Sequence, residues 1–328
     1  TVITFFDVPG FQAELINKNV PFYCLGYRNI LSLPSILLKL RKYVEKLKPD
    51  VIHSHMVSSI LISRLFLFSK SKVLIETFHC TSKEIRRWAY FLLFISSRRA
   101  SFTSCVSKAM LSYAKENRLS NQLGYIPNAV DDSFFSSNKD VSFEDANTCF
   151  KWVTIGRLIP KKGYDLLIDA CFELKKNGGL FTLDIFGDGP LLNNLNLKII
   201  ELKLQDEITL QGVDRNLSKK LNNYHGFISS SLIEAFGIVI IEAMAAGLPV
   251  CLTNCDGPIE ILENNNDCGF LVKINNVLDL YQGMEDLMFL DENTLSAMSQ
   301  HAKGLVSSKY TQKSIFEQWS AKYTLSKT

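Results

Sequence analysis

Two glutamates stand inside an otherwise apolar run, SSSLIEAFGIVIIEAMAAGLP, at residues 229–249. Seven residues separate Glu234 from Glu242, and four branched aliphatic residues lie between them. If Glu234 lies in a loop and Glu242 in the helix that follows, the two carboxylates can contact different parts of one extended ligand, because eight helical residues rise about 12 Å. The alternative is that Glu242 is a satisfied helix carboxylate and Glu234 a loop cap, and that neither binds a ligand.

A second group of charged residues lies between an expected strand and an expected helix. The segment GRLIPKKG holds three cations between two glycines: Gly156, Arg157, Lys161, Lys162 and Gly163. Arginine offers a planar fork to phosphate oxygens and lysine a point charge, so this loop predicts an anion-binding site. A solvated basic loop is the alternative. No nicotinamide cofactor is expected, because the later turn IFGDGP is not a GxGxxG motif.

These residues must be positioned by strands and helices. The sequence predicts such elements, because short aliphatic runs alternate with amphipathic segments along the chain. The runs predict buried strands at 2–6, 50–55, 72–78, 152–156, 181–186, 226–230 and 248–253. A helix is predicted at 163–179, where two glycines end it. Another is predicted at 33–49, with one apolar face formed by Leu33, Leu37, Leu40, Val44 and Leu47. This alternation indicates an α/β protein with largely parallel sheets.

The alternation pauses at residues 126–150, where we place a linker between two domains. The prediction is an N-terminal domain at 1–140 and a C-terminal domain at 141–306, both Rossmann-like and doubly wound. Open α/β sheets bind ligands at the carboxyl ends of their strands, so the main site is expected in a cleft where the domains face each other. The run after Gly237 also suits a strand, but we expect a helix whose free N–H groups face that cleft.

Composition excludes several classes of protein. The chain has 328 residues and a net charge of +3, which gives no indication of a nucleic-acid partner. Its eight cysteines form no disulfide-like framework, and no second Cys/His pair joins Cys251 and Cys255 in a zinc site. No apolar run reaches about 18 residues and no signal peptide is recognised, so a cytoplasmic protein with reduced thiols is expected.

Three motifs in order carry a resemblance to a known family. GRLIPKKGYDLLIDA, FGDGP and SSSLIEAFGIVIIEAMAAGLPV resemble the donor-binding half of the retaining glycosyltransferases of family 4, which have the GT-B fold. The pair of glutamates with seven residues between them is the hallmark of that family. The likeness is strong over residues 152–272, whereas the N-terminal half matches only in outline, through PDVIHSH, IETFHC, CVSKAM and IPNAVD.

The resemblance implies a role for each matching residue. Arg157 and Lys162 would neutralise the donor diphosphate, with Lys161 assisting. Glu242 would bind the ribose hydroxyls of the nucleotide, and Glu234 the hydroxyls of the transferred sugar. His79 would lie against the donor sugar from the N-terminal domain, whereas His53 and His55 are interpreted as structural, with an acceptor-side role for His55 as the alternative. The remaining donor-binding positions are Gly156, Gly187, Val213, Ala235, Phe236, Gly237 and Ile238.

The resemblance also implies the chemistry. Negative charge builds on the leaving phosphate during sugar transfer, and cations with a helix N-terminus stabilise it. No Asp-x-Asp motif occurs to hold a divalent metal, so no metal and no cofactor are expected. No carboxylate stands out as a nucleophile, which favours same-face attack with the leaving phosphate accepting the proton.

The expected function is that of a hexosyltransferase. It would move a sugar from a nucleotide diphosphate sugar, with a UDP-sugar favoured, to a glycan or lipid-linked acceptor in bacterial surface polysaccharide assembly, such as O-antigen or capsule. A GT-B epimerase or phosphorylase and a non-catalytic nucleotide-sugar-binding module are the alternatives.

Two further segments carry expectations. Residues 83–99 combine arginines with aromatic residues and predict either a helix packed on the sheet with cationic ends, or an interfacial helix on the inner face of the cytoplasmic membrane. The apolar spacing in 307–328 predicts a C-terminal helix that crosses back to the N-terminal domain, with Phe316 and Trp319 contacting residues before Asn128.

The N-terminus departs from the family pattern. TVITFFDVPG predicts a strand leading into a turn at 7–10. The family's first strand and Gly-rich turn are not found before it, so the expectation is either a chain truncated at this point or a chain without this element. Donor binding is expected in either case, whereas acceptor binding and full turnover are not assured by the sequence.

Overall fold

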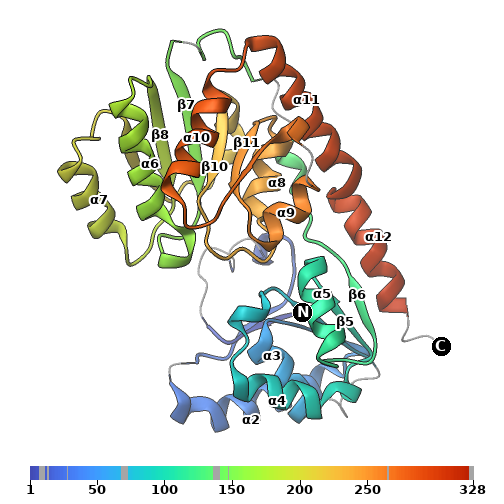
Figure 1. Cartoon of the computed structure of the whole chain (residues 1–328). Coiled ribbons are helices and arrows are strands. Elements are labelled where there is room, and N and C mark those ends of the chain that lie inside the picture. Colours follow the sequence, from blue (N-terminus) through green and yellow to red (C-terminus); the bar gives the residue numbers. More distant parts are fainter. Residues whose placement is uncertain are drawn as a thin grey trace.

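In the computed structural model, two parallel sheets lie one above the other, and two successive C-terminal helices, α11 and α12, run beside them (Figure 1). The structure describes residues 1–324 apart from 7–11, 13–14, 28, 68–72, 136–140, 147 and 264–265. The turn predicted at 7–10 lies outside the described residues. The α/β class expected from the sequence is confirmed.

The C-terminal sheet has six parallel strands in the order β12-β11-β10-β7-β8-β9. Its strands are β7 (Phe150–Ile155), β8 (Phe181–Phe186), β9 (Ile208–Gly212), β10 (Gly226–Ser229), β11 (Val250–Thr253) and β12 (Gly269–Val272). Its helices are α6 (Tyr164–Lys176), α7 (Leu192–Glu201), α8 (Ile238–Ala245), α9 (Asp256–Leu262), α10 (Val277–Met288) and α11 (Glu292–Lys309). The chain proceeds outward from β7 to β9 and then returns to the other side of β7 as β10. The order therefore reverses between β7 and β10, where a doubly wound sheet has its ligand-binding crevice.

The N-terminal domain contains a four-stranded parallel sheet in the order β3-β4-β5-β6 and a separate parallel pair, β1-β2. Its strands are β1 (Val2–Thr4), β2 (Phe22–Cys24), β3 (Val51–His55), β4 (Val73–Phe78), β5 (Phe102–Cys105) and β6 (Leu123–Tyr125). Its helices are α2 (Leu33–Leu47), α3 (Val57–Ile62), α4 (Arg87–Ile95) and α5 (Lys108–Glu116).

An ion pair without solvent exposure lies within the N-terminal domain. Arg64, in the short π-helical segment η2 (Ser63–Leu67) after α3, binds both carboxylate oxygens of Glu76 on β4 at 2.8 and 2.7 Å. Both side chains are fully buried. Thr103 also donates to Glu76, and Arg64 donates to the carbonyls of Leu93 and Leu119. The charges are therefore compensated by hydrogen bonds, as burial requires.

The buried face of α2 consists of partly different residues from those predicted. Ile36, Leu40 and Val44 are buried, whereas Leu47 is 37% exposed. The prediction followed leucines and omitted Ile36, which lies four residues before Leu40 and shares its face because a helix repeats every 3.6 residues.

The C-terminal helix α12 (Gln312–Tyr323) reaches the N-terminal domain. Ile315 is buried with Val73, Ile75, Phe102 and Ile126, and Trp319 packs against the same cluster. The contact predicted for Trp319 is therefore present. Phe316 is not part of this cluster and its side chain is 68% exposed, so the contact expected for it stays a prediction. Ile315 and Trp319 are four residues apart and share one helix face, from which Phe316 points away.

The chain passes between the domains twice, and the two passages lie side by side. Val130, in the outgoing segment, forms a parallel β-bridge with Thr311 at the start of α12. The Val130 amide donates to the Tyr310 carbonyl at 2.8 Å. Asp131 accepts a hydrogen bond from Gln312 at 3.0 Å. The linker and the returning chain are thus fastened to each other.

Candidate functional site

The two loops that carry the predicted anion site and the first glutamate leave adjacent strands. The loop after β7 ends in the short helix η6 (Pro160–Lys162), and the loop after β10 leads to α8. Because β7 and β10 flank the reversal of strand order, these loops meet at the carboxyl edge of the sheet. The amide of Leu232 donates to the Lys161 carbonyl at 2.8 Å, and the Ser230 hydroxyl donates to the Lys162 carbonyl at 3.0 Å.

Gly163 makes this approach possible. Its φ is +66°, and a Cβ there would lie 2.1 Å from the carbonyl oxygen of Ser230. A side chain would therefore separate the two loops.

Lys162 and Glu234 form an ion pair across the two loops. The lysine Nζ lies 2.5 Å from the carboxylate Oε2, and the side chains are 16% and 17% exposed. In this state each charge satisfies the other, so a ligand that needs both must separate them. Arg157 lies on the same loop with an exposed side chain, and no ion pair is recorded for it within the described ranges.

The predicted glycine positions lie around this ion pair. A Cβ at Gly156 would be 3.4 Å from the Lys162 side chain, and one at Gly187 would be 1.9 Å from the Gly156 carbonyl oxygen. The Gly187 amide donates to the Gly212 carbonyl at 2.7 Å. Val213 follows Gly212 directly in the sequence, so it lies near Gly187. Val213 is 72% exposed. The structure thus places Gly156, Gly187 and Val213 in one row along the strand ends.

The residues predicted at the start of α8 surround Gly237. Gly237 has a φ of +101° and precedes the helix, which begins at Ile238 as expected. Phe236 is buried, and its ring centroid lies 5.5 Å from that of Tyr310. Ala235 packs against the core, and Ile238 is 42% exposed. The amides of Ile240 and Ile241 donate to the Gly237 carbonyl, and the first amides of a helix have no partner within the helix, which leaves those of Ile238 and Val239 for a ligand.

Glu242 lies further along α8 and differs from Glu234 in its environment. Burial, and secondarily the charge of Asp131, raises the pKa of Glu242 to about 7. No hydrogen bond or ion pair to Glu242 is recorded within the described part of the chain. Among the described residues, Glu234 therefore has a cationic partner, whereas the charge that acts on Glu242 is that of Asp131.

Three histidines meet at the carboxyl edge of the N-terminal sheet. His55 Nδ1 lies 2.9 Å from His79 Nε2, and the rings of His53 and His55 lie 4.2 Å apart. His53 also contacts Tyr323 of α12 and Thr77, both at 2.8 Å. Burial lowers the pKa of His53 to about 3 and of His79 to about 4, and it also lowers the pKa of His55. All three rings are therefore neutral near pH 7.

Sequence reasoning did not foresee that His55 and His79 would touch. The sequence does indicate that His53 and His55 lie together, because alternate residues of a strand share one face and His53-Ser54-His55 have that spacing. Their meeting with His79 depends on the register of β3 with β4, which pairs His55 with Thr77.

Glu84 is a second residue that sequence reasoning missed. It accepts a hydrogen bond from Lys161 Nζ at 2.9 Å, which joins the N-terminal domain to the anion-binding loop. Glu84 lies in η3 (Ser82–Glu84), where it completes a capping box with Thr81. The spacing Thr-x-x-Glu could have indicated the capping box, but not the contact between domains.

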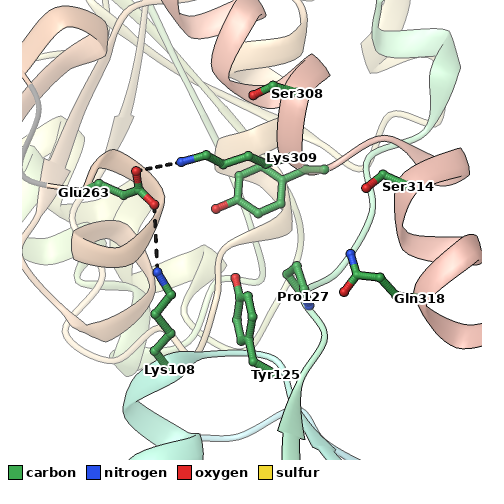
Figure 2. A pocket seen from close by; sticks show the side chains of 9 residues that line it. Lys108, Tyr125, Pro127, Glu263, Ser308, Lys309, Ser314 and Gln318 are labelled. Carbon is green, nitrogen blue, oxygen red and sulfur yellow. Dashed lines mark hydrogen bonds and ion pairs between the residues drawn. The ribbon is translucent and has the colours of Figure 1, made fainter. Parts of the chain in front are cut away.

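A cavity of about 300 Å³ lies between the domains at the start of α12 (Figure 2). Glu263 binds Lys309 at 2.6 Å and lies 3.9 Å from Lys108 in its wall. Close by, Glu260 accepts a hydrogen bond from the Lys108 amide, a contact between α9 and α5. None of the predicted site residues lines this cavity. We interpret it as part of the contact between the domains.

No group of three or more His, Cys, Asp or Glu residues among those described is arranged so that it could hold a metal ion. All eight cysteines are free thiols. None of the described helices is both long and apolar enough to cross a bilayer.

Two family descriptions match the chain. "Glycosyl transferases group 1" matches residues 138–304, and "Glycosyltransferase Family 4" matches residues 1–134. Together they account for both domains.

The relatives of the chain include two bacterial glycosyltransferases with named substrates. The chain is 27% identical to N-acetylgalactosamine-N,N'-diacetylbacillosaminyl-diphospho-undecaprenol 4-alpha-N-acetylgalactosaminyltransferase of Campylobacter jejuni, over 83% of this chain and 76% of the relative. It is 23% identical to UDP-Gal:alpha-D-GlcNAc-diphosphoundecaprenol alpha-1,3-galactosyltransferase of Escherichia coli, over 88% of this chain and 78% of the relative.

A solved structure has the same fold. Anabaena Alr3699/HepE, in complex with UDP and glucose, superposes with a TM-score of 0.83 over 98% of this chain and 91% of that chain, at 19% identity.

Proposed function

The chain belongs to the group 1 glycosyltransferases with the GT-B fold, and on that premise we propose that it transfers a sugar from a UDP-sugar to a glycan or lipid-linked saccharide. The proposed setting is the assembly of a bacterial surface polysaccharide, such as O-antigen or capsule, at the cytoplasmic face of the membrane. The names of two relatives that act on diphospho-undecaprenol-linked saccharides support this acceptor class. The UDP in the complex of a protein of the same fold supports the choice of donor.

The ion pair between Lys162 and Glu234 is the observation that carries the proposal. A nucleotide diphosphate sugar has an anionic diphosphate next to a ring with hydroxyl groups. Such a donor could exchange both partners at once, with the diphosphate taking Lys162 and the sugar hydroxyls taking Glu234. Arg157 would add a second cation to the diphosphate, and the amides at the start of α8 would donate to its oxygens.

The remaining predicted residues fit the two ends of the same ligand. Glu242 would accept hydrogen bonds from the ribose hydroxyls, with the nucleobase near Gly187 and Val213. His79, held by His55, would face the donor sugar from the N-terminal domain. Because burial keeps this imidazole neutral, it would serve as a hydrogen-bond partner and not as a charge.

The reaction breaks the bond between the anomeric carbon and the leaving phosphate oxygen, and forms a bond from that carbon to an acceptor hydroxyl. The hydroxyl proton would pass to the leaving phosphate on the same face of the sugar, so the anomeric configuration is retained. Arg157, Lys162 and the α8 amides would stabilise the charge that develops on the phosphate. We propose that these groups do so without a metal ion.

Thermal denaturation with a panel of UDP-, GDP- and ADP-sugars tests the donor, because a bound ligand raises stability by mass action. We expect stabilisation by a UDP-sugar, followed by release of UDP when the acceptor is added. Change of the sugar without an acceptor would favour an epimerase, and phosphate-dependent glycan breakdown a phosphorylase. Donor binding without any transfer or hydrolysis would favour a non-catalytic binding module.

A further inference from the structure

Helix α4 presents an apolar face to solvent on the N-terminal domain, at the end away from the C-terminal domain (Figure 1). Trp88 is 58% exposed, Phe91 60% and Ile95 57%, and Phe94 beside them is 43% exposed. Residues three, four and seven positions apart share one side of a helix, so these side chains form a single stripe.

The opposite side of α4 is fixed to the domain. Ala89 and Leu93 are buried. The Leu93 carbonyl accepts a hydrogen bond at 2.9 Å from Arg64, whose guanidinium is held by the buried Glu76. The helix therefore cannot turn its exposed stripe inward without breaking a buried charge network, which is strongly destabilising.

Arginines lie at both ends of the stripe. Arg86 and Arg87 occupy the N-cap and first position of α4, and Arg98 and Arg99 follow its end; all four are exposed. No acidic residue occurs between residues 85 and 100. Two cations at a helix N-terminus oppose the helix dipole, so helix stability alone does not account for them.

We propose that this face of α4 is a docking surface for an anionic lipid bilayer. The aromatic and aliphatic stripe enters the headgroup region, and Arg86, Arg87 and Arg98 at its ends bind lipid phosphates. The positive charge with no acidic residue is complementary to an anionic surface. Docking rests on exposure and charge alone, whereas a role in presenting a lipid-linked acceptor rests on the proposed function.

The place of α4 in the chain connects this surface to the site. Glu84, which pairs with Lys161 of the anion-binding loop, is followed two residues later by Arg86 at the N-cap of α4. His79 lies at the start of the same segment. The chain therefore runs from the segment that faces the donor directly into the N-terminal end of α4.

Co-sedimentation with vesicles tests the proposal. We expect binding to phosphatidylcholine vesicles that contain phosphatidylglycerol, weaker binding as salt is raised, and little binding to phosphatidylcholine alone. Each arginine near an anionic surface contributes on the order of 1 kcal/mol, so Arg86→Gln with Arg87→Gln should lower the partition coefficient roughly thirtyfold. Emission from Trp88 should shift to shorter wavelength on binding, and this shift should be absent in Trp88→Phe.

A matched control distinguishes the effect of the α4 stripe from the effect of any exposed aromatic side chain. Phe91→Glu should abolish vesicle binding, whereas Phe289→Glu, at a 76% exposed phenylalanine on the C-terminal domain, should not. Both variants should melt like the wild type and keep stabilisation by UDP, which makes a failure of docking distinguishable from a failure of the proposed function. If the wild type ignores anionic vesicles, or if Phe91→Glu binds them like the wild type, the proposal is wrong. A dimer that Phe91→Glu dissociates would instead assign the stripe to a second copy of the chain.

Discussion

Lys162 and Arg157 differ in whether a ligand must first break an ion pair in order to bind them. Lys162 is held by Glu234, whereas no ion pair is recorded for Arg157 within the described ranges. A charge-assisted hydrogen bond contributes about 1.5–3 kcal/mol, so Arg157→Ala should weaken UDP binding by roughly tenfold or more. Lys162→Ala should also weaken it, although the lysine must first leave Glu234. Calorimetry measures both, with exposed Lys176→Ala as the control, and unchanged affinity in both site variants would contradict the assignment.

The two glutamates should separate nucleotide binding from sugar transfer. Glu242→Gln should weaken free UDP as well as the UDP-sugar, because the proposed contact is with ribose. Glu234→Gln should cut transfer but not weaken free UDP, since it also releases Lys162 for the diphosphate. Equal losses of UDP affinity in the two variants would refute this division of roles.

The raised pKa of Glu242 predicts a pH dependence of stability. Its pKa is about 7 in the folded chain against about 4.3 when unfolded, so the folded state holds a proton that the unfolded state releases between these values. Folding is therefore penalised increasingly as pH rises through this window. Glu242→Gln should match the wild type near pH 4, below the unfolded pKa, and exceed its stability by on the order of 3 kcal/mol near pH 8. Urea denaturation at both pH values measures this, with exposed Glu201→Gln as the control; the same difference at both would contradict it.

At the scale of elements, the approach of two loops depends on Gly163. Gly163→Ala would force a Cβ against the Ser230 carbonyl and strain a positive φ, so it should reduce both stability and UDP affinity. Gly304→Ala is the matched control, because its Cβ meets nothing within 4 Å in the interior of α11. That change should stabilise the chain by about 0.5–1 kcal/mol. Thermal melts and calorimetry compare the two, and a Gly163→Ala variant with unchanged UDP affinity would show that the loops tolerate separation.

Much of the C-terminal domain could be predicted because its strands are apolar and its loops carry glycines. Strand β5 was missed because its buried residues include Thr103 and Ser104, which resemble a loop when only apolar runs are sought. Thr103 is tolerated there because it donates to the buried Glu76, a partner that lies 27 residues earlier.

The sequence proposes which residues form the candidate site, but it does not indicate which of them pair with one another. The contacts of Lys161 with Glu84 and of His55 with His79 join elements far apart in sequence. Such contacts depend on strand register and domain placement, which local spacing does not encode. The separation of Ile315 from Phe316 on α12 has a similar origin, since both residues are apolar and only the docked helix distinguishes them.

At the scale of the whole molecule, α12 joins the C-terminal domain to the N-terminal sheet. Trp319 packs on the cluster of Ile315, Val73 and Phe102, and its ring lies 4.6 Å from that of His53. Trp319→Ala should therefore destabilise the chain by about 2 kcal/mol or more. Phe316→Ala, at an exposed position of the same helix, should change stability by less than about 0.5 kcal/mol. Urea denaturation measures both, and equal effects would mean that the crossing contact contributes little.

The fastening of Val130 to Thr311 limits how the two halves can move. Two independent tethers at distant points would resist both opening and twisting, whereas one flexible tether would permit every rotation. Two chain segments that are hydrogen-bonded side by side act as one hinge, which bends readily about a single axis and resists twisting. The two domains would then open and close mainly by rotation about that axis. Arg157 and His79 would approach and withdraw along a fixed arc, and each closure would return the same alignment of donor and acceptor.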